Sequence, residues 1–194
     1  MRNIFWITTS IFCLISVVLL IMSFANRKIE MPAYKVIKKY DEVEVRLYPK
    51  MIVAKTKLAE NSFDNQGSNG FRTIANYIFG GNEKNEKIAM TAPVVMDMGD
   101  TASMYFVMPK AYDKSELPKP NSGKVEIVEE VEKTLAVISF GGYSSDDKIE
   151  KFRKKLEQTL VENKLKTKGS YLFMGYNAPW DFINRRNEVA IELE

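Results

Sequence analysis

The sequence predicts an α+β fold in which one antiparallel sheet is flanked by two helices. Three observations support this: short stretches of alternating apolar and polar residues, two stretches with the period of an amphipathic helix, and the order of these stretches. Strands, a helix and further strands occur twice, in two pseudo-repeated halves with negligible sequence identity. Two such halves can bury their apolar faces together by forming one sheet with both helices against it.

The first half is expected to contain short strands and one helix. Alternating apolar residues between Val36 and Ala54 predict the strands. Residues 61–70 are rich in Asn, Ser and Gly and predict a loop. A helix with Asn69 as N-cap and a stop at Gly80 should follow, because four apolar residues then share one helical face. These four are Phe71, Ile74, Ala75 and Ile78.

The remaining strands and the second helix follow the same logic. Apolar stretches predict strands at residues 88–96, 104–108, 125–131, 134–140, 171–176 and 188–193. A second helix should begin near Ser145, with Ser144 and Asp147 as a variant capping box. Its apolar stripe consists of Ile149, Phe152, Leu156 and Leu160.

The first 26 residues predict a membrane segment. No charged residue lies between Asn3 and Asn26, and a helix rising about 1.5 Å per residue can cross about 30 Å of hydrocarbon over that length. The segment is either an uncleaved anchor or a signal peptide cleaved after Ser23-Phe24-Ala25. Its length favours the transmembrane anchor. The short basic N-terminus favours export of the domain to the periplasmic or extracellular side, whereas Arg27 and Lys28 favour a cytoplasmic domain.

Composition restricts what residues 27–194 can do. This length supports one core rather than two. The formal net charge is +3 and the lysines are interleaved with glutamates, so we expect no nucleic-acid partner. The chain has no histidine, and its one cysteine, Cys13, lies in the apolar segment. Zinc sites, Cys–His nucleophiles and Ser–His–Asp triads are therefore excluded in this domain, which favours a protein that is not an enzyme.

Several motifs resemble one family of small binding domains. The most informative are Lys87-Ile88-Ala89-Met90-Thr91-Ala92-Pro93-Val94 and Arg185-Arg186-Asn187-Glu188-Val189; others begin at Tyr34, Leu117, Phe140 and Tyr176. In this order they resemble the SOUL/haem-binding-protein family from about Tyr34 to the C-terminus. The resemblance implies a distorted, barrel-like antiparallel sheet with two helices outside it. It also implies that the ligand is haem or another porphyrin, bound non-covalently.

The resemblance places the tetrapyrrole against the first helix and its neighbouring loops. Phe71, Ile74 and Ile78, with Ala75 on the same face, could pack on the macrocycle, and Arg72 could reach a propionate. The alternative is that this stripe is simply core. Tyr176, Trp180 and Phe182 could provide an aromatic wall, or could form a packed corner between the last two strands.

Two further motifs have a structural interpretation. Met90 could ligate iron, but methionine is more often a core filler, so we assign no metal ligand. An arginine of the Arg185-Arg186 pair is expected to meet a carboxylate at the entrance of a strand, and the alternative is a phosphate or propionate site. The leading hypothesis is therefore binding of haem or a related planar tetrapyrrole in an apolar cleft without a histidine ligand. The alternative is a small-molecule effector-binding or protein-interaction domain on the same fold.

Overall fold

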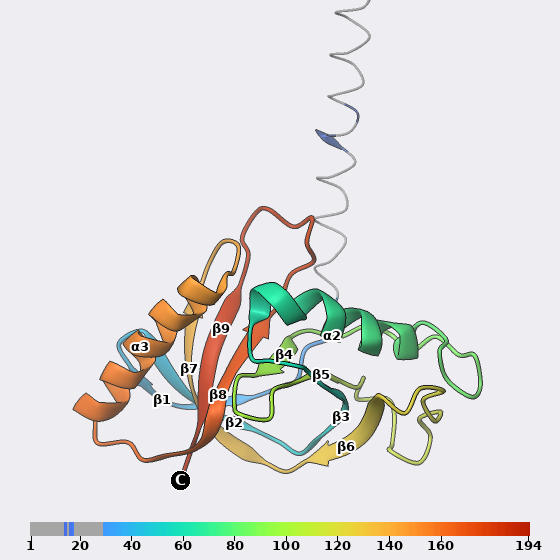
Figure 1. The fold of residues 1–194 in the computed structure, drawn as a ribbon. Helices are drawn as coiled ribbons and strands as arrows, with labels where there is room; N and C mark the ends of the chain where they lie inside the picture. The colour runs from blue at the N-terminus through green and yellow to red at the C-terminus, as the bar shows by residue number, and fades with distance from the viewer. Residues whose placement is uncertain (1–13, 15, 18–28) are drawn as a thin grey trace, which may run out of the picture.

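The computed structural model describes Leu14, residues 16–17 and residues 29–194, and these contain one sheet and two long helices (Figure 1). The elements are β1 (Lys35–Tyr40), β2 (Val43–Tyr48), β3 (Met51–Lys57), α2 (Phe63–Ile78), β4 (Val94–Asp97), β5 (Ser103–Val107), β6 (Val125–Glu130), β7 (Lys133–Phe140), α3 (Asp146–Glu162), β8 (Thr167–Gly175) and β9 (Asn187–Leu193). The expected α+β class, antiparallel sheet and pair of helices are confirmed.

The nine strands form an open but strongly curled sheet. Their order is β1-β2-β7-β9-β8-β4-β5-β3-β6, and every pairing between them is antiparallel. In a flat sheet β2 and β3 would lie about 29 Å apart, at roughly 4.8 Å per strand. The chain joins Tyr48 to Met51 through only Pro49 and Lys50, which span at most about 11 Å. The sheet must therefore bend until its two ends approach each other.

This curvature does not close a barrel. The sheet ends at β1 and β6, each of which pairs with a single neighbour. The barrel-like expectation was thus correct for the curvature and wrong for closure, because β1 and β6 do not pair with each other.

Both helices cover one face of the sheet. Met96 of β4 packs in the cluster with α3, whereas Met104 of β5 packs in the cluster with α2, and these two methionines are direct cross-strand partners. Directly paired residues share a face, so α2 and α3 lie on the same side. The opposite face carries no helix, yet Tyr48, Val53, Tyr105 and Met174 on it are buried. It is therefore the inside of the curl.

The first helix begins earlier than the sequence predicted. Residues 63–70 are helical rather than a loop, and the N-cap is Ser62, whose hydroxyl accepts a hydrogen bond from the Asn65 amide at 3.1 Å. Phe63 anchors this first turn because its ring meets that of Phe173 edge-on at 4.9 Å. Tertiary contact here outweighs the low helix propensity of the Asn, Ser and Gly residues.

Gly70 allows α2 to lie close to the sheet. A Cβ atom at this position would come within 2.7 Å of Leu58 Cδ2 and 3.0 Å of Met104 Sδ. The glycine that suggested a loop is therefore a contact point in the middle of a helix.

Two smaller expectations also change. The strand predicted at residues 88–96 is limited to β4, because residues 88–93 form the approach to it: the Ile88 amide donates to Ile78 and the Thr91 hydroxyl to Val107. The N-cap of α3 is Ser145 rather than Ser144, and its hydroxyl accepts from the Lys148 amide at 3.3 Å. The stripe of α3 packs as expected, with Ile149, Leu156 and Leu160 buried.

The membrane segment predicted from Asn3 to Asn26 lies outside the described residues, apart from Leu14, Ser16 and Val17. Within the described part of the chain, no helix is long and apolar enough to cross a bilayer.

Candidate functional site

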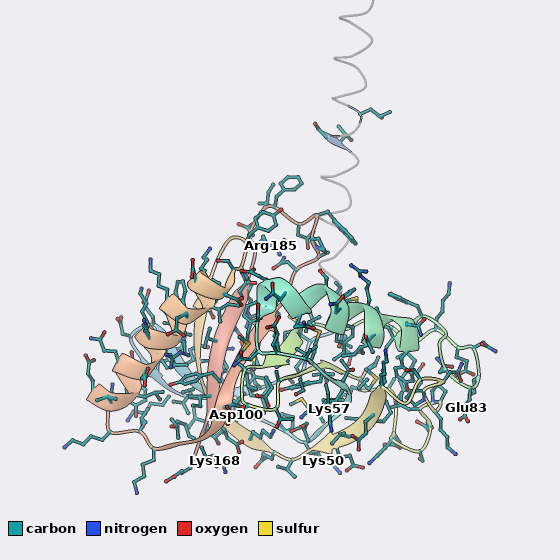
Figure 2. The ribbon with its side chains drawn as sticks, viewed as in Figure 1. Lys50, Lys57, Glu83, Asp100, Lys168 and Arg185 are labelled. Carbon is teal, nitrogen blue, oxygen red and sulfur yellow. The ribbon has the colours of Figure 1, made fainter. Side chains whose placement is uncertain are left out.

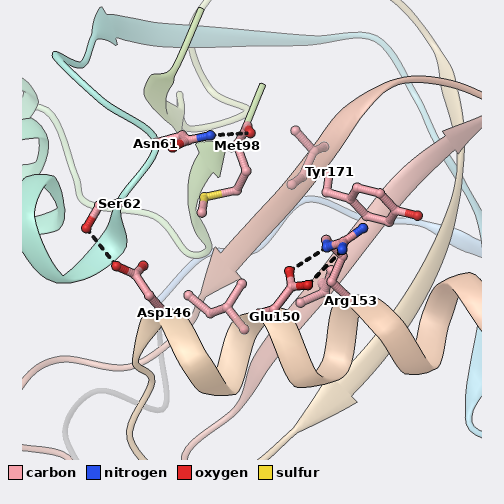
Figure 3. A pocket seen from close by; sticks show the side chains of 10 residues that line it. Asn61, Ser62, Met98, Asp146, Glu150, Arg153 and Tyr171 are labelled. Carbon is pink, nitrogen blue, oxygen red and sulfur yellow. Dashed lines mark hydrogen bonds and ion pairs between the residues drawn. The ribbon is translucent and has the colours of Figure 1, made fainter. Parts of the chain in front are cut away.

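A groove of 390 Å³ lies between α3, β8 and the residues that lead into α2 (Figure 3). Its floor is largely apolar and its rim is charged. The lining residues are Asn61, Ser62, Met98, Asp146, Ile149, Glu150, Arg153, Tyr171, Leu172 and Val189.

One end of the groove is closed where the two helices begin. The Ser62 hydroxyl donates to one carboxylate oxygen of Asp146 at 2.6 Å, and the Phe63 amide donates to the other at 2.7 Å. The Asp146 amide in turn donates to Asp64 at 3.1 Å. Each carboxylate lies at a helix N-terminus, where exposed amides and the helix dipole favour negative charge. These contacts join α2 to α3 and account for the Ser62–Asp146 pair without a catalytic role.

The rim is formed by an ion pair on α3 that covers an aromatic ring. The Arg153 guanidinium donates to both carboxylate oxygens of Glu150, at 2.5 and 2.7 Å, and lies 5.2 Å from the centre of the Tyr171 ring. The hydrogen bond from Arg153 lowers the pKa of Glu150, and burial raises the pKa of the Tyr171 hydroxyl. The groove therefore offers apolar contact, one aromatic face and a charged edge, which suits an amphipathic small molecule.

Sequence reasoning did not find this groove. The stripe containing Ile149 was recognised as core, but Asn61 and Ser62 were assigned to a loop, and Tyr171 to a strand with no other role. The spacing of Glu150 and Arg153 on one helix was the available signal, although such pairs are common on solvated helices.

The structure separates the predicted site residues of α2 into two kinds. Ile74, Ala75 and Ile78 face the sheet and are 0%, 8% and 1% exposed. Phe71 is partly buried, with its ring 5.3 Å from that of Phe106 on β5. Arg72 is exposed on the opposite side of the helix. Only Phe71 and Arg72 are thus open to a ligand from outside without rearrangement of the core.

The second predicted group lies in the loop between β8 and β9. Trp180 and Phe182 are 45% and 47% exposed at its tip, whereas Tyr176 is partly buried at its base. The groove lies on the helix-covered side of the sheet, and none of the predicted site residues lines it. Their role in binding remains a prediction.

A buried charge network lies inside the curl, below this loop. Glu188 is fully buried, and its carboxylate accepts hydrogen bonds from Arg46, Arg186, Tyr176 and Ser139 at 2.7 to 3.0 Å. The expected pairing of an arginine with a carboxylate at a strand entrance is confirmed by Arg186 and Glu188. Arg46 and Ser139, which lie far away in the sequence, were not found by sequence reasoning.

The network also determines the ionisation of its members. Burial by itself would raise the pKa of Glu188, but the charge of Arg46, the hydrogen bond from Tyr176 and the charge of Arg186 together hold it below its usual value. Burial raises the pKa of Tyr176, with the negative charge of Glu188 acting in the same direction. The tyrosine therefore stays a neutral donor and the glutamate an anion.

In the described part of the chain, no three acidic, cysteine or histidine side chains are grouped so that they could hold a metal ion. The sequence contains no histidine at all.

Comparison with known proteins gives one consistent family. A family model described as SOUL heme-binding protein matches residues 29–192. Human "Heme-binding protein 2" is 33% identical over 75% of this chain and 75% of its own length, and the mouse protein of the same name is 30% identical over 84% and 86%. "Heme-binding protein 1" of Xenopus laevis is 26% identical over 69% and 74%.

Solved structures resemble the chain in fold. The crystal structure of the EcmrR C-terminal domain matches with a TM-score of 0.61 and 13% identity, over 83% of this chain and 98% of that domain. An uncharacterized conserved protein from Listeria innocua matches with a TM-score of 0.55 and 12% identity, over 79% and 92%. At these identities the likeness concerns the fold alone.

Proposed function

Because the chain belongs to the SOUL heme-binding protein family, we propose that it binds haem or a related tetrapyrrole non-covalently and catalyses no reaction on it. One observation carries this proposal: the family match spans residues 29–192, which include both described long helices and all of the described strands except the last residue of β9. With no histidine in the chain, iron coordination would contribute little to affinity, and binding would depend on apolar and aromatic contacts.

The accessible members of the predicted set are the best candidates for contact with the ligand. Phe71 on α2, with Trp180 and Phe182 on the β8–β9 loop, supply aromatic surface for a flat macrocycle. Arg72 is exposed and can pair with a propionate through its planar guanidinium. Tyr176 holds the base of the loop, Ile74 and Ile78 pack in the same core cluster as Phe71, and Ala75 is buried beside them on the helix.

The test is a titration of the full-length protein in detergent with haemin and with iron-free protoporphyrin. We expect similar affinities for the two, because no histidine is present to bind the iron. A haemin complex much tighter than the protoporphyrin complex, with a low-spin spectrum, would contradict this and indicate a methionine, tyrosine or lysine ligand.

Two arginine variants locate the ligand. Arg72→Ala should weaken porphyrin binding about tenfold, because a charge-assisted hydrogen bond contributes roughly 1.5–3 kcal/mol when shielded from water and less at an exposed site. Arg153→Ala is the matched control, since it removes the same group from the groove. Weakened porphyrin binding by the Arg153→Ala protein, with unchanged binding by the Arg72→Ala protein, would place the ligand in the groove.

A second function is supported by the groove itself. Its apolar floor, the Tyr171 ring and the Glu150–Arg153 rim would suit a small amphipathic effector. In that case Arg153→Ala should change binding of small amphipathic molecules while the porphyrin titration shows no saturable site.

We also propose that residues 3–26 anchor the domain to a membrane, with the domain on the exported side. The support is the absence of charge over this stretch. Full-length protein should stay with membranes in alkaline carbonate, and protease added to intact cells should cleave the domain. A soluble product beginning near Asn26 would show cleavage of a signal peptide instead.

A further inference from the structure

The tip of the β8–β9 loop exposes an unusual amount of apolar surface. Trp180, Phe182 and Ile183 are 45%, 47% and 49% exposed, and they lie within four consecutive residues. Tyr143, 58% exposed, joins them from the loop between β7 and α3, and its hydroxyl donates to the Pro179 carbonyl at 3.3 Å. In Figure 1 this loop projects beyond the ends of β8 and β9. A contiguous exposed apolar cluster of this kind usually marks a surface for a partner.

The loop is held in this conformation by polar contacts at its base. Asp181, which lies between the exposed residues, is only 3% exposed and its carboxylate accepts from the Ala178 amide at 3.2 Å. Arg185 donates to the carbonyls of Ala178 and Asp181 and stacks on the Tyr143 ring at 4.2 Å. Figure 2 labels Arg185 at this loop. The charged groups therefore turn inward and the apolar groups outward, the reverse of what solvation alone favours.

The N-terminal segment from Glu30 to Tyr34 lies at the same end of the sheet. The Ala92 amide donates to the Glu30 carbonyl at 2.9 Å, two residues before β4 begins. The first residue of β4, Val94, pairs with Gly175, where β8 ends and the loop begins. Arg186, at the far end of the loop, donates to the Tyr34 hydroxyl at 3.3 Å. The N-terminal segment thus meets the domain beside both ends of this loop.

Chain length limits how far this end can lie from the apolar segment. The eight residue-to-residue steps from Asn26 to Tyr34 span at most roughly 29 Å when fully extended. If residues 3–26 lie in a bilayer, Tyr34 and the base of the loop lie within that distance of its surface. Arg27 and Lys28, directly after the apolar stretch, are suited to lipid phosphates.

We propose that the tip formed by Trp180, Phe182 and Ile183 docks on the surface of a lipid bilayer. Tryptophan, phenylalanine and isoleucine on a fixed loop match the chemistry of the membrane interface, where tryptophan is enriched because its ring is apolar and its N–H is polar. Docking would place the proposed tetrapyrrole contacts of Trp180 and Phe182 at the bilayer, where an amphiphilic ligand partitions. That consequence rests on the proposed tetrapyrrole binding, whereas the docking itself rests only on the proposed membrane anchor.

Tryptophan fluorescence tests the docking in the full chain without any porphyrin. The sequence has two tryptophans, Trp6 and Trp180, so a Trp6→Phe variant leaves Trp180 as the only reporter. In phosphatidylcholine vesicles with brominated acyl chains, Trp180 should be quenched by the bromine atoms and shielded from iodide in the solution. The added substitutions Phe182→Ser and Ile183→Ser should reverse both effects.

A matched control uses an exposed aromatic position elsewhere. Phe79, at the end of α2, is 57% exposed. In a variant carrying Trp6→Phe, Trp180→Phe and Phe79→Trp, the new reporter should remain open to iodide and unaffected by brominated lipid. Equal iodide quenching of the two reporters in vesicle-bound protein would overturn the docking alone, whereas failure of the chain to associate with vesicles would overturn both the docking and the proposed anchor. Trp180 quenched by lipid in a protein that shows no porphyrin binding would support docking and reject the proposed function alone.

Discussion

The two faces of the curled sheet are both buried, but they are stabilised by different means. The outer face is covered by α2 and α3 through apolar side chains such as Ile74, Phe106 and Leu156. The inner face has an apolar centre, and at the end below the β8–β9 loop it carries Glu188 with Arg46 and Arg186. Apolar packing is non-directional, whereas a carboxylate with four donor residues requires one arrangement of all of them.

The difference explains which segments each face positions. Glu188 accepts from Tyr176, at the start of the loop, and from Arg186, at its end. Arg46 of β2 lies over the Tyr34 ring at 4.4 Å, and Arg186 donates to the Tyr34 hydroxyl. One buried carboxylate therefore ties together β2, the N-terminal segment and both ends of the exposed loop. The outer face attaches two helices, and its polar contacts at Asp146 join only the starts of those helices.

Replacement of Glu188 should have the largest effect on stability. Glu188→Ala removes the buried counter-charge of Arg46, which keeps only its ion pair with the partly exposed Glu44 at 2.9 Å, and breaking a buried pair in this way typically costs about 3–5 kcal/mol. We expect a loss of this size in the free energy of unfolding, measured by urea denaturation of the detergent-solubilised full chain. Mobility of the loop should increase as well, seen as faster cleavage by protease between residues 176 and 186.

Ser139→Ala is the matched control, because it removes one neutral donor to the same carboxylate and no charge. A cost of roughly 1.5–3 kcal/mol is expected, as for a hydrogen bond to a charged group, without faster cleavage of the loop. Equal effects of the two substitutions would show that the charges of the network do not distinguish the inner face from the outer one.

Truncation of the apolar side chains by which α2 and α3 pack on the sheet tests the outer face. It should lower the free energy of unfolding somewhat less than Glu188→Ala does. Ile74→Ala and Leu156→Ala each remove a fully buried aliphatic side chain, at an expected cost of about 2–5 kcal/mol. In contrast to Glu188→Ala, neither should accelerate cleavage of the β8–β9 loop. Porphyrin affinity of the folded Ile74→Ala protein should change little, because Ile74 supports the wall from the core. A large loss of affinity in a stable Ile74→Ala protein would place the ligand against this residue directly.

The sequence predicted the outer face better than the inner one, for a physical reason. The period of a helix is local, so spacing alone placed Ile74 and Ile78 on one face of the first helix, as ligand wall or core, and Leu156 and Leu160 in the apolar stripe of the second. The curl of the sheet depends on pairings between distant strands, and no local pattern shows that Arg46 meets Glu188 from 142 positions away. The prediction of where α2 begins was wrong for the same reason, because Phe63 in its first turn is held by Phe173 of β8.

The two candidate sites differ in the same way: the one built from residues close in the sequence was predicted, and the one assembled by the fold was not. Aromatic residues at 176–182 were recognised as a possible surface because they are close in the sequence. The groove was missed because its residues come from α3, β8, β9 and the ends of two loops, which only the fold brings together.

The smallest expected effect is on the pH dependence of stability. The pKa of Glu188 is lowered in the folded protein below its ordinary value of 4.5, so the folded state favours the ionised form more than the unfolded state does. The stabilisation from its charge is therefore complete above pH 4.5 and is lost as the pH falls through the folded-state pKa. Glu188→Gln cannot titrate, so its free energy of unfolding should fall less steeply than that of the wild type below pH 4.5. Parallel pH profiles from urea denaturation would show that folding does not shift the pKa of Glu188, and the inner face would then differ from the outer one by hydrogen bonds rather than by charge.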